Sequence, residues 1–105
     1  MAEYNGWTNY ETWVVALRMD NDQGSYNAAR EQAAEVLEQA TEDHPEYLTP
    51  KERAVYILSE TFKEEHEEAN PLADAASVYS DLLGAALSEV NWHEIATNVI
   101  DEVSE

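Results

Sequence analysis

The chain of 105 residues contains no cysteine. Without thiols it cannot form a disulfide framework, a zinc–thiolate site or a cysteine nucleophile. Glycine is also scarce, and the three glycines stand apart from one another, so no glycine-rich loop can hold a phosphate group. These absences exclude several common kinds of metal centre, nucleotide site and nucleophilic enzyme.

The chain also contains few positively charged residues. Five Lys and Arg face 23 Asp and Glu, which gives a net charge of −18 at pH 7. Phosphate binding needs cationic side chains, so direct binding to nucleic acid or to an anionic membrane surface is not expected. A basic protein surface or free cations are the expected partners.

Long apolar runs are missing as well, and the N-terminus MAEYNGW has neither a basic segment nor an apolar one. We therefore expect a soluble, unexported protein of the cytoplasm. The length indicates a single domain over residues 1–105, with residues 1–7 as a possible N-terminal arm. Three Trp and six Tyr argue against disorder despite the high charge.

Apolar residues recur with the helical period, and no segment alternates with period two. The pattern predicts an all-α fold, a compact bundle of about five amphipathic helices with short connections. The expected helices cover approximately residues 9–20, 26–41, 50–68, 71–89 and 92 onward.

The first helix contains the longest apolar run. Thr8 and Glu11 match a capping box that would start it. Its expected buried face places Trp13 in the core. Just before the cap, Tyr4 and Trp7 are candidates for an exposed aromatic contact. The whole expected face comprises Tyr10, Trp13, Val14 and Leu17.

Other helix starts carry their own signals. Ser25 is the expected N-cap of the second helix. Thr49 and Glu52 form a second capping box, and Asn91 with Glu94 begins the fifth helix. The fourth helix has the cleanest amphipathic pattern and contains Gly84, which suggests close helix packing or a slightly weakened helix. Its expected apolar face comprises Leu72, Ala75, Ala76, Tyr79, Leu82, Leu83, Ala86 and Val90.

No catalytic constellation is evident. His44, His66 and His93 are scattered, and the sequence that begins at His93 has Thr97 where a zinc-protease motif needs its second histidine. We therefore expect no catalytic residue, no metal site, no cofactor and no enzymatic activity.

One fragment resembles a calcium loop. Asp20, Asp22 and Glu31 fall at positions one, three and twelve of an EF-hand. However, Gly24 occupies the fifth position, where an oxygen ligand is required, and Glu31 falls inside a helix that has already begun. A helix end followed by a new N-cap explains the same residues.

Two groups of glutamates remain. Neighbours at helical spacing lie roughly 5–6 Å apart and repel one another. Phosphates along a DNA strand advance about 3.4 Å each, so such rows approach the linear charge density of a nucleic acid. The rows are Glu31, Glu35, Glu38 and Glu42 in the second helix, and Glu60, Glu64 and Glu67 or Glu68 in the third. The expected partner-binding residues are Glu31, Glu35, Glu38, Glu42, Glu60, Glu64, Glu65, Glu67 and Glu68.

These rows have two interpretations. They can mimic nucleic acid and occupy the basic groove of a protein built for it. They can equally be solvated faces of a protein adapted to concentrated salt, where screening removes the self-repulsion. In the second case the protein is a non-enzymatic interaction module with an apolar contact at Tyr4, Trp7 and Trp92.

The stretch Gly6 to Trp13, with Val15 to Leu17 and Asp20 to Asp22, resembles the opening of small uncharacterised proteins encoded on phages, plasmids and other mobile elements. Their signature reads close to N-Y-E-T-W-N-V-x-L-W. Val90 to Ala96 is similar to their second motif. This chain departs at Val14, where asparagine is expected, and at Arg18, where an aromatic residue is frequent. The resemblance implies a genetic context but no catalytic residue.

That context favours the mimic, because mobile elements gain from blocking host defences that act on DNA. The leading hypothesis is therefore a small viral or mobile-element accessory protein that inhibits a host DNA- or RNA-handling protein through its acidic faces.

Overall fold

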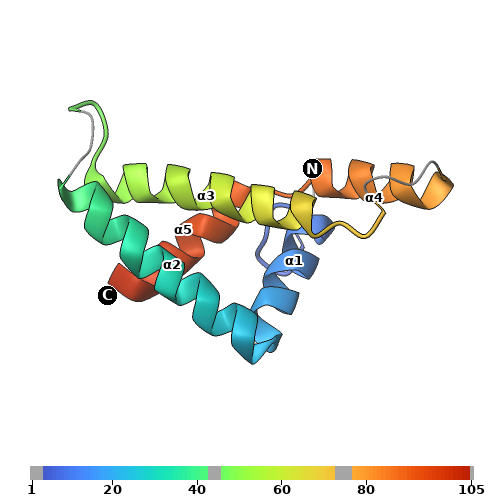
Figure 1. Cartoon of the computed structure of the whole chain (residues 1–105), viewed down its shortest axis with the longest axis horizontal. Helices are drawn as coiled ribbons and strands as arrows, with labels where there is room; N and C mark the ends of the chain where they lie inside the picture. The colour runs from blue at the N-terminus through green and yellow to red at the C-terminus, as the bar shows by residue number, and fades with distance from the viewer. Residues whose placement is uncertain (1–3, 43–45, 73–76, 105) are drawn as a thin grey trace.

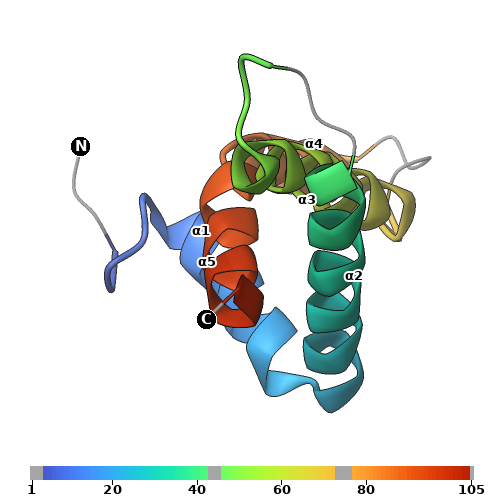
Figure 2. The same cartoon turned by 90° about the vertical axis from the view of Figure 1, so that its left-hand side faces the viewer.

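The computed structural model describes residues 4–42, 46–72 and 77–104, and these contain five helices and no strand. The helices are α1 (Tyr10–Asn21), α2 (Gln23–Glu42), α3 (Pro50–Glu68), α4 (Val78–Ser88) and α5 (Trp92–Ser104). Figures 1 and 2 show α3 crossing above α2 and α5, which lie on the same side of it. The predicted all-α bundle is confirmed.

The core lies where α2, α3 and α5 meet. Phe62 and Leu58 of α3 and Ile95 and Ile100 of α5 are fully buried. α2 contributes alanines, which let its backbone approach the other two helices closely. The buried residues of all three helices recur with the helical period. Their buried residues are Ala29, Ala33 and Ala40 in α2; Ala54, Val55, Leu58 and Phe62 in α3; and Trp92, Ile95, Ala96, Val99 and Ile100 in α5.

α1 buries a different face from the one predicted. Thr12, Ala16 and Met19 are buried, and Val15 packs against the core beside them. This set has the same helical spacing as the predicted one but is displaced by two residues. The prediction followed the largest apolar side chains, whereas the space against α2 and α5 accepts smaller ones. Tyr10 and Leu17 are consequently exposed, and Trp13 is half-buried.

The predicted start of α1 is also wrong. Asn9 is the N-cap, and its side-chain oxygen accepts a hydrogen bond from the Thr12 amide at 2.9 Å. The Thr8 amide, which the capping box assigned to Glu11, donates instead to Glu94 of α5 at 2.9 Å. A partner distant in sequence replaces the local one, and the same bond ties the entry of α1 to α5.

α2 starts three residues earlier than predicted. The Asp22 carboxylate accepts hydrogen bonds from the Ser25 hydroxyl at 2.7 Å and from the Ser25 amide at 2.9 Å. Asp22 therefore both ends α1 and caps α2, and Ser25 is its donor rather than the N-cap. The hydroxyl and then the amide of Ser25 lower the pKa of Asp22 below its usual value of 3.8.

α3 starts as predicted. The Thr49 hydroxyl accepts from the Glu52 amide, and the Glu52 carboxylate accepts from the Thr49 amide at 2.9 Å. The Thr49 amide, followed by its hydroxyl, lowers the pKa of Glu52 below 4.5. The predicted interval between the second and third helices includes residues 43–45, which lie outside the described residues.

α4 is shorter than predicted, and little of its surface packs against the other described helices. The Asn70 side chain accepts a bond from the Leu72 amide at 2.8 Å, which holds residues 70–72 in a turn instead of a helix. Residues 73–76 lie outside the described part, and Ser77 caps α4 through a box with Ser80. No residue of α4 is buried. The predicted close packing at Gly84 is wrong, since an added Cβ there would meet nothing within 4 Å.

The position of α4 gives the molecule its elongated shape. α4 extends from the body formed by the other helices (Figure 1). The radius of gyration is 14.7 Å, against roughly 13 Å for a compact domain of this length. The fold is thus a compact bundle with one projecting helix.

Residues 4–7 form a tight turn in front of α1. Asn5 and Gly6 have φ values of 49° and 88°, the sign that both central positions of a type I′ turn require. Tyr4 and Trp7 exchange two backbone hydrogen bonds of 2.8 Å across it. The turn sends Trp7 onto the core, where it is half-buried, and directs Tyr4 back over α1.

Candidate protein-binding surfaces

The glutamate row of α2 lies on the face opposite its core. Glu31, Glu35, Glu38 and Glu42 are all exposed. At 3.6 residues per turn they fall within one narrow stripe, about half a turn from the buried alanines of the same helix. The stripe runs from Glu31 to Glu42, eleven steps along the helix, which corresponds to about 17 Å of helix axis.

The glutamates of α3 divide into two groups. Glu60, Glu64 and Glu67 point away from the buried side of the helix. Glu68 lies to one side of it, and all four are exposed. Glu65 lies nearer α2, and its carboxylate accepts a hydrogen bond of 2.7 Å from the Gln32 side chain. Glu65 therefore bridges α2 and α3, and the structure separates it from the other predicted site residues of α3.

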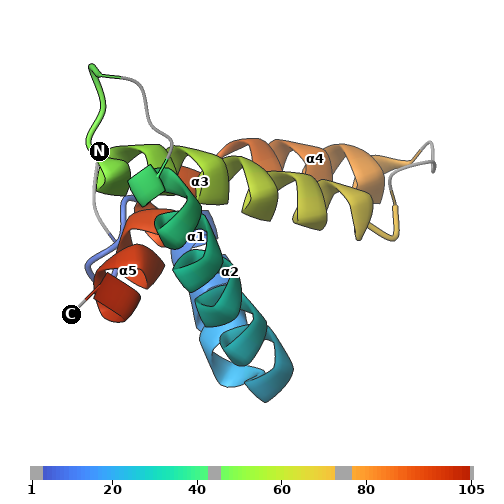
Figure 3. The same cartoon turned by 60° about the vertical axis from the view of Figure 1, so that its left-hand side comes forward.

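The two rows are not parallel. In Figures 1 and 3 the axes of α2 and α3 converge toward the connection between them and diverge toward the start of α2 and the end of α3. The glutamate cluster at the end of α3 is thus well separated from the beginning of α2. We regard the rows as two neighbouring acidic surfaces rather than one flat patch.

Cations do not neutralise these rows. Within residues 4–42, 46–72 and 77–104, none of the nine glutamates forms an ion pair within 4.0 Å. The ion pairs present join Arg30 to Asp20 and Glu102, and Lys51 to Asp101. The few cations that form ion pairs therefore serve acids outside the rows.

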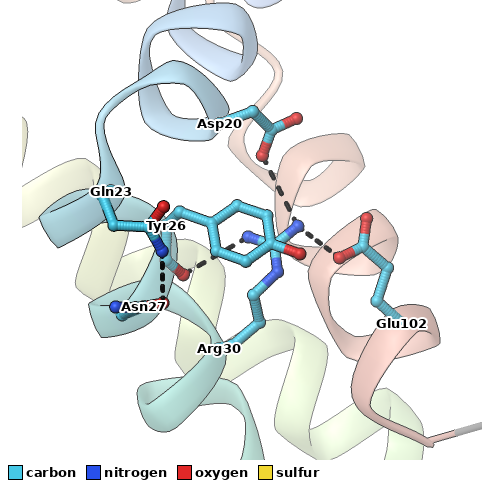
Figure 4. Close-up of polar contacts among 6 residues, drawn as sticks. All are labelled: Asp20, Gln23, Tyr26, Asn27, Arg30 and Glu102. Atoms are coloured by element: carbon cyan, nitrogen blue, oxygen red, sulfur yellow. Dashed lines mark hydrogen bonds and ion pairs between the residues drawn. The ribbon is translucent and has the colours of Figure 1, made fainter.

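Arg30 is one of the cations that form these ion pairs. Its guanidinium lies between Asp20 of α1 and Glu102 of α5, and its central carbon is 3.6 Å from the centre of the Tyr26 ring (Figure 4). The side chain is mostly buried. Arg30 thus links three helices, and its charge is not available to the glutamate rows.

The end of α3 is electrostatically unfavourable. Four glutamates occupy its last five residues, next to carbonyl groups that already carry partial negative charge. His66 is the one basic residue there, and its ring lies against Trp92 with Nδ1 2.8 Å from the Phe62 carbonyl oxygen. Apart from the Glu65–Gln32 bond, no described contact of these glutamate side chains offsets the repulsion.

A second surface is aromatic. Tyr4, Tyr10 and Trp13 pack ring against ring, with centroids 4.9–5.8 Å apart. Tyr10 is 53% exposed, and Leu17 continues the same face of α1. Of the predicted aromatic contacts, Tyr4 is exposed, while Trp7 is half-buried against the core and Trp92 is buried.

Sequence reasoning missed Tyr10, Trp13 and Leu17 as surface residues, because it assigned them to the core. Two signals were present in the sequence. α1 contains a second set of core-compatible residues two positions further on, and Asn5-Gly6 between two aromatic residues is a strong sign of a tight turn.

The calcium-loop residues have separate partners. Asp20 pairs with Arg30, Asp22 caps α2, and Glu31 belongs to the exposed row of α2. In the described part of the chain, no three His, Asp or Glu side chains are grouped to hold a metal ion. His93 is exposed and His66 is half-buried, whereas His44 lies outside the described residues.

Within the described ranges, no helix has the length and apolar character needed to cross a membrane.

Comparison with known proteins gives a family and no function. The chain belongs to a family of unknown function, DUF7249, whose model matches residues 1–105. No curated protein and no solved structure matches the chain.

Proposed function

We propose that this protein binds and inhibits a nucleic-acid-handling protein by presenting carboxylates where that protein receives phosphates. The observation that carries the proposal is that the glutamates of α2 and α3 are exposed and without ion pairs in the described structure. The partner is a basic, nucleic-acid-binding protein of the host cytoplasm, such as a defence nuclease, and the protein itself is a non-enzymatic product of a virus or mobile element.

Charge spacing supports this proposal. The α2 row presents four carboxylates over about 17 Å of axis, and one DNA strand presents about five phosphates over that length. A groove lined with Lys and Arg therefore meets a similar number of anions on either ligand. Binding of the row excludes the nucleic acid from the groove by occupying it.

The energetic cost of the acidic cluster supports it further. Each acidic residue near a helix C-terminus is unfavourable by about 0.3–1 kcal/mol, and the last five residues of α3 include four of them. The core of α3 needs Phe62 and Leu58 but no glutamate in that turn. An intermolecular contact gives these residues a purpose that the fold does not.

Electrostatic attraction between this chain, whose net charge is −18, and a basic partner accelerates their association. We expect the association rate to fall steeply between about 0.05 and 0.5 M salt, because screening shortens the range of the attraction. The dissociation rate should change less.

The test begins with capture. The full chain, immobilised, is exposed to a host lysate, and bound proteins are released first by a DNA duplex and then by salt. The captured protein is purified, and its affinity is measured for wild type and for two variants with equal net charge. One carries Glu60→Gln and Glu64→Gln in the α3 row. The other carries Glu46→Gln and Glu89→Gln, which are exposed glutamates outside both rows.

The row variant should bind at least about tenfold more weakly, while the control stays within about threefold of wild type. Equal losses in both variants would mean that only net charge matters. Capture that DNA cannot release would contradict mimicry.

Salt adaptation is the alternative explanation of the same glutamates. A salt-adapted protein should lose helical circular dichroism at low salt and recover it at about 1 M KCl, since screening removes its self-repulsion. A mimic must stay folded at about 0.1 M salt. Full helicity at low salt would contradict the main prediction of the salt-adaptation explanation.

A second candidate function rests on the aromatic face of α1. Tyr4, Tyr10 and Trp13 with Leu17 form an apolar contact for a protein partner. Partner binding through this face should survive molar salt and be lost in Tyr10→Ser. Binding lost in salt and retained in Tyr10→Ser would assign the contact to the glutamates instead.

A further inference from the structure

A groove runs between the last turns of α3 and helix α4. Figures 1 and 3 show the two helices side by side there, with opposite chain directions. The groove has a volume of about 690 Å³, within the range of roughly 300–1,000 Å³ that is usual for binding clefts in proteins. Its lining comes from the end of α3, from one side of α4 and from the start of α5. The groove is therefore large enough to receive part of a second molecule.

The most buried residues of the lining are apolar. Val90 and Trp92 are buried, and Leu72 and Leu87 are half-buried. Together these four side chains form a hydrophobic floor. Such a floor favours an occupant with leucine-like side chains, because their burial removes apolar surface from water.

The wall that α4 contributes is made largely of small residues. Ser80, Gly84 and Ser88 follow one another at i, i+4 and i+8, and all three line the groove. The Ser80 hydroxyl donates to the Ser77 carbonyl oxygen at 2.8 Å, and the Ser88 hydroxyl donates to the Ala85 carbonyl oxygen at 2.6 Å. Neither hydroxyl needs a partner from outside. Because small side chains shorten the distance at which helices pack, this wall lets another helix approach closely.

The rims of the groove are acidic. Glu67 of α3 and Asp81 of α4 line it, and both are exposed. Glu60 and Glu64 lie next to Glu67 on the same side of α3. In the part of the chain that the structure describes, none of these four acids forms an ion pair, and Lys63 is the one cation in the lining. Charge complementarity therefore favours an occupant that carries Lys and Arg beside its apolar residues.

The walls also decide the conformation of the occupant. The backbone groups inside α3 and α4 bond to one another, so the walls offer no row of free N–H and C=O groups to an extended segment. A helix satisfies its own backbone groups and brings only side chains to the contact. Two helices that lie side by side leave a furrow into which the side chains of a third helix fit.

We propose that this groove is the docking site for a basic amphipathic helix of a partner protein. The apolar residues of that helix, at i, i+3, i+4 and i+7, lie on the hydrophobic floor, and its Lys and Arg face the acidic rims. The eleven residues of α4 extend about 16 Å, which corresponds to about three turns of the docked helix. The proposal goes beyond the mimicry of nucleic acid and does not rest on it, because the floor recognises apolar side chains.

The test uses a synthetic peptide of about 14 residues, with leucines at i, i+3, i+4 and i+7 and lysines elsewhere. A control peptide has the same composition, but its leucines are spread around the helix, so only the apolar face is lost. Isothermal titration calorimetry measures the binding of both peptides to the full chain in about 0.1 M and about 0.5 M NaCl. The amphipathic peptide should bind at least about tenfold more tightly at both salts, because screening does not weaken the burial of leucine.

Two variants with unchanged charge assign the site. Gly84→Leu fills the groove, and Ala85→Leu places the same side chain on the exposed outer side of α4. Gly84→Leu should weaken binding of the amphipathic peptide at least about tenfold, while Ala85→Leu stays within about threefold of wild type. Circular dichroism should show that both variants are folded, since a Cβ at position 84 meets nothing within 4 Å and leucine favours a helix more than glycine does. In wild type, NMR signals of the Gly84 amide and the Trp92 indole should shift on binding.

Three results would overturn the proposal. Equal affinity for the two peptides would mean that charge alone attracts them. Wild-type affinity in Gly84→Leu would place the contact outside the groove. Equal losses in Gly84→Leu and Ala85→Leu would assign the contact to the outer side of α4.

Failure of this proposal and failure of nucleic-acid mimicry give different results, because Gly84→Leu keeps every carboxylate of the glutamate rows. Peptide binding in the groove, without capture of any protein that DNA releases, would support the docking site and contradict mimicry. Capture that depends on Glu60 and Glu64, without a preference for the amphipathic peptide, would contradict the docking site alone.

Discussion

α4 and α5 follow each other in the chain, but only α5 is buried in the core. α5 has thirteen residues, of which five are buried, whereas α4 has eleven and buries none. Both begin with a side-chain cap, and both have an apolar face in their sequence. The difference is that α5 packs against α2 and α3, while α4 extends away from the bundle (Figure 1). An apolar face in the sequence predicts that a helix packs against something, but it does not show which element or molecule that is.

The largest test of this comparison is a matched truncation. Ile100→Ala in α5 should lower the free energy of unfolding by about 2–5 kcal/mol, because it removes a fully buried side chain and leaves a cavity. Leu82→Ala in α4 should change it by no more than about 0.5 kcal/mol. Urea denaturation of both variants at low protein concentration measures the difference. Similar losses would show that α4 belongs to the cooperative core.

The next test concerns the junction that fixes α5. The fully buried Thr12 hydroxyl donates to Asn9 at 2.6 Å and accepts from the Asn91 amide at 2.8 Å, which joins α1 to the start of α5. Thr12→Val preserves the shape but leaves the Asn91 amide without its acceptor, so stability should fall by about 1–3 kcal/mol. Thr12→Ser keeps the hydroxyl and should lose less. Equal losses would attribute the effect to packing alone.

Matched caps give a smaller effect. Asn91→Ala removes the acceptor of the Glu94 amide and should cost about 1 kcal/mol of global stability. Ser77→Ala removes the corresponding cap of α4, but it should raise hydrogen exchange only in α4, because that helix opens without the core. Native-state hydrogen exchange by NMR distinguishes the two. A global loss in Ser77→Ala would contradict independent opening of α4.

The smallest test uses pH. Folding lowers the pKa of Glu52 through the Thr49 amide and hydroxyl, so this cap stabilises α3 above pH 4.5 and is lost as pH falls through the lower folded value. The advantage of wild type over Glu52→Gln should therefore shrink on acidification and vanish once the Glu52 carboxyl is protonated in both the folded and the unfolded protein. The Ser77–Ser80 box of α4 contains no carboxylate and should not respond. An advantage that does not shrink as the pH is lowered through the titration of Glu52 would contradict the cap assignment.

Sequence reasoning succeeded where the local signal and the tertiary contact agree. The start of α3 was predicted to the residue, since Thr49, Pro50 and Glu52 satisfy one another within a single turn. The exposure of the α2 row followed from helical spacing alone. Whether the glutamates bind a partner remains a prediction that the fold neither requires nor excludes.

The failures have a common cause in longer-range contacts. Glu94 takes the Thr8 amide that the local capping box had assigned to Glu11. The space between α2 and α5 selects Ala16 and Met19 of α1 in place of Trp13 and Leu17. For α4, the clean amphipathic pattern was real, but nothing in the described chain covers its outward residues.

The sequence by itself determined the class of fold, most helix positions and the excess of negative charge, because helical periodicity, caps and ionisation are local properties. Only the tertiary structure decided which face of α1 is buried, that Glu65 binds Gln32, and that α4 stands apart with large apolar side chains exposed. Those outcomes depend on how much space neighbouring helices leave and on which polar groups they bring within reach. Neither quantity is encoded in the spacing of residues along one helix.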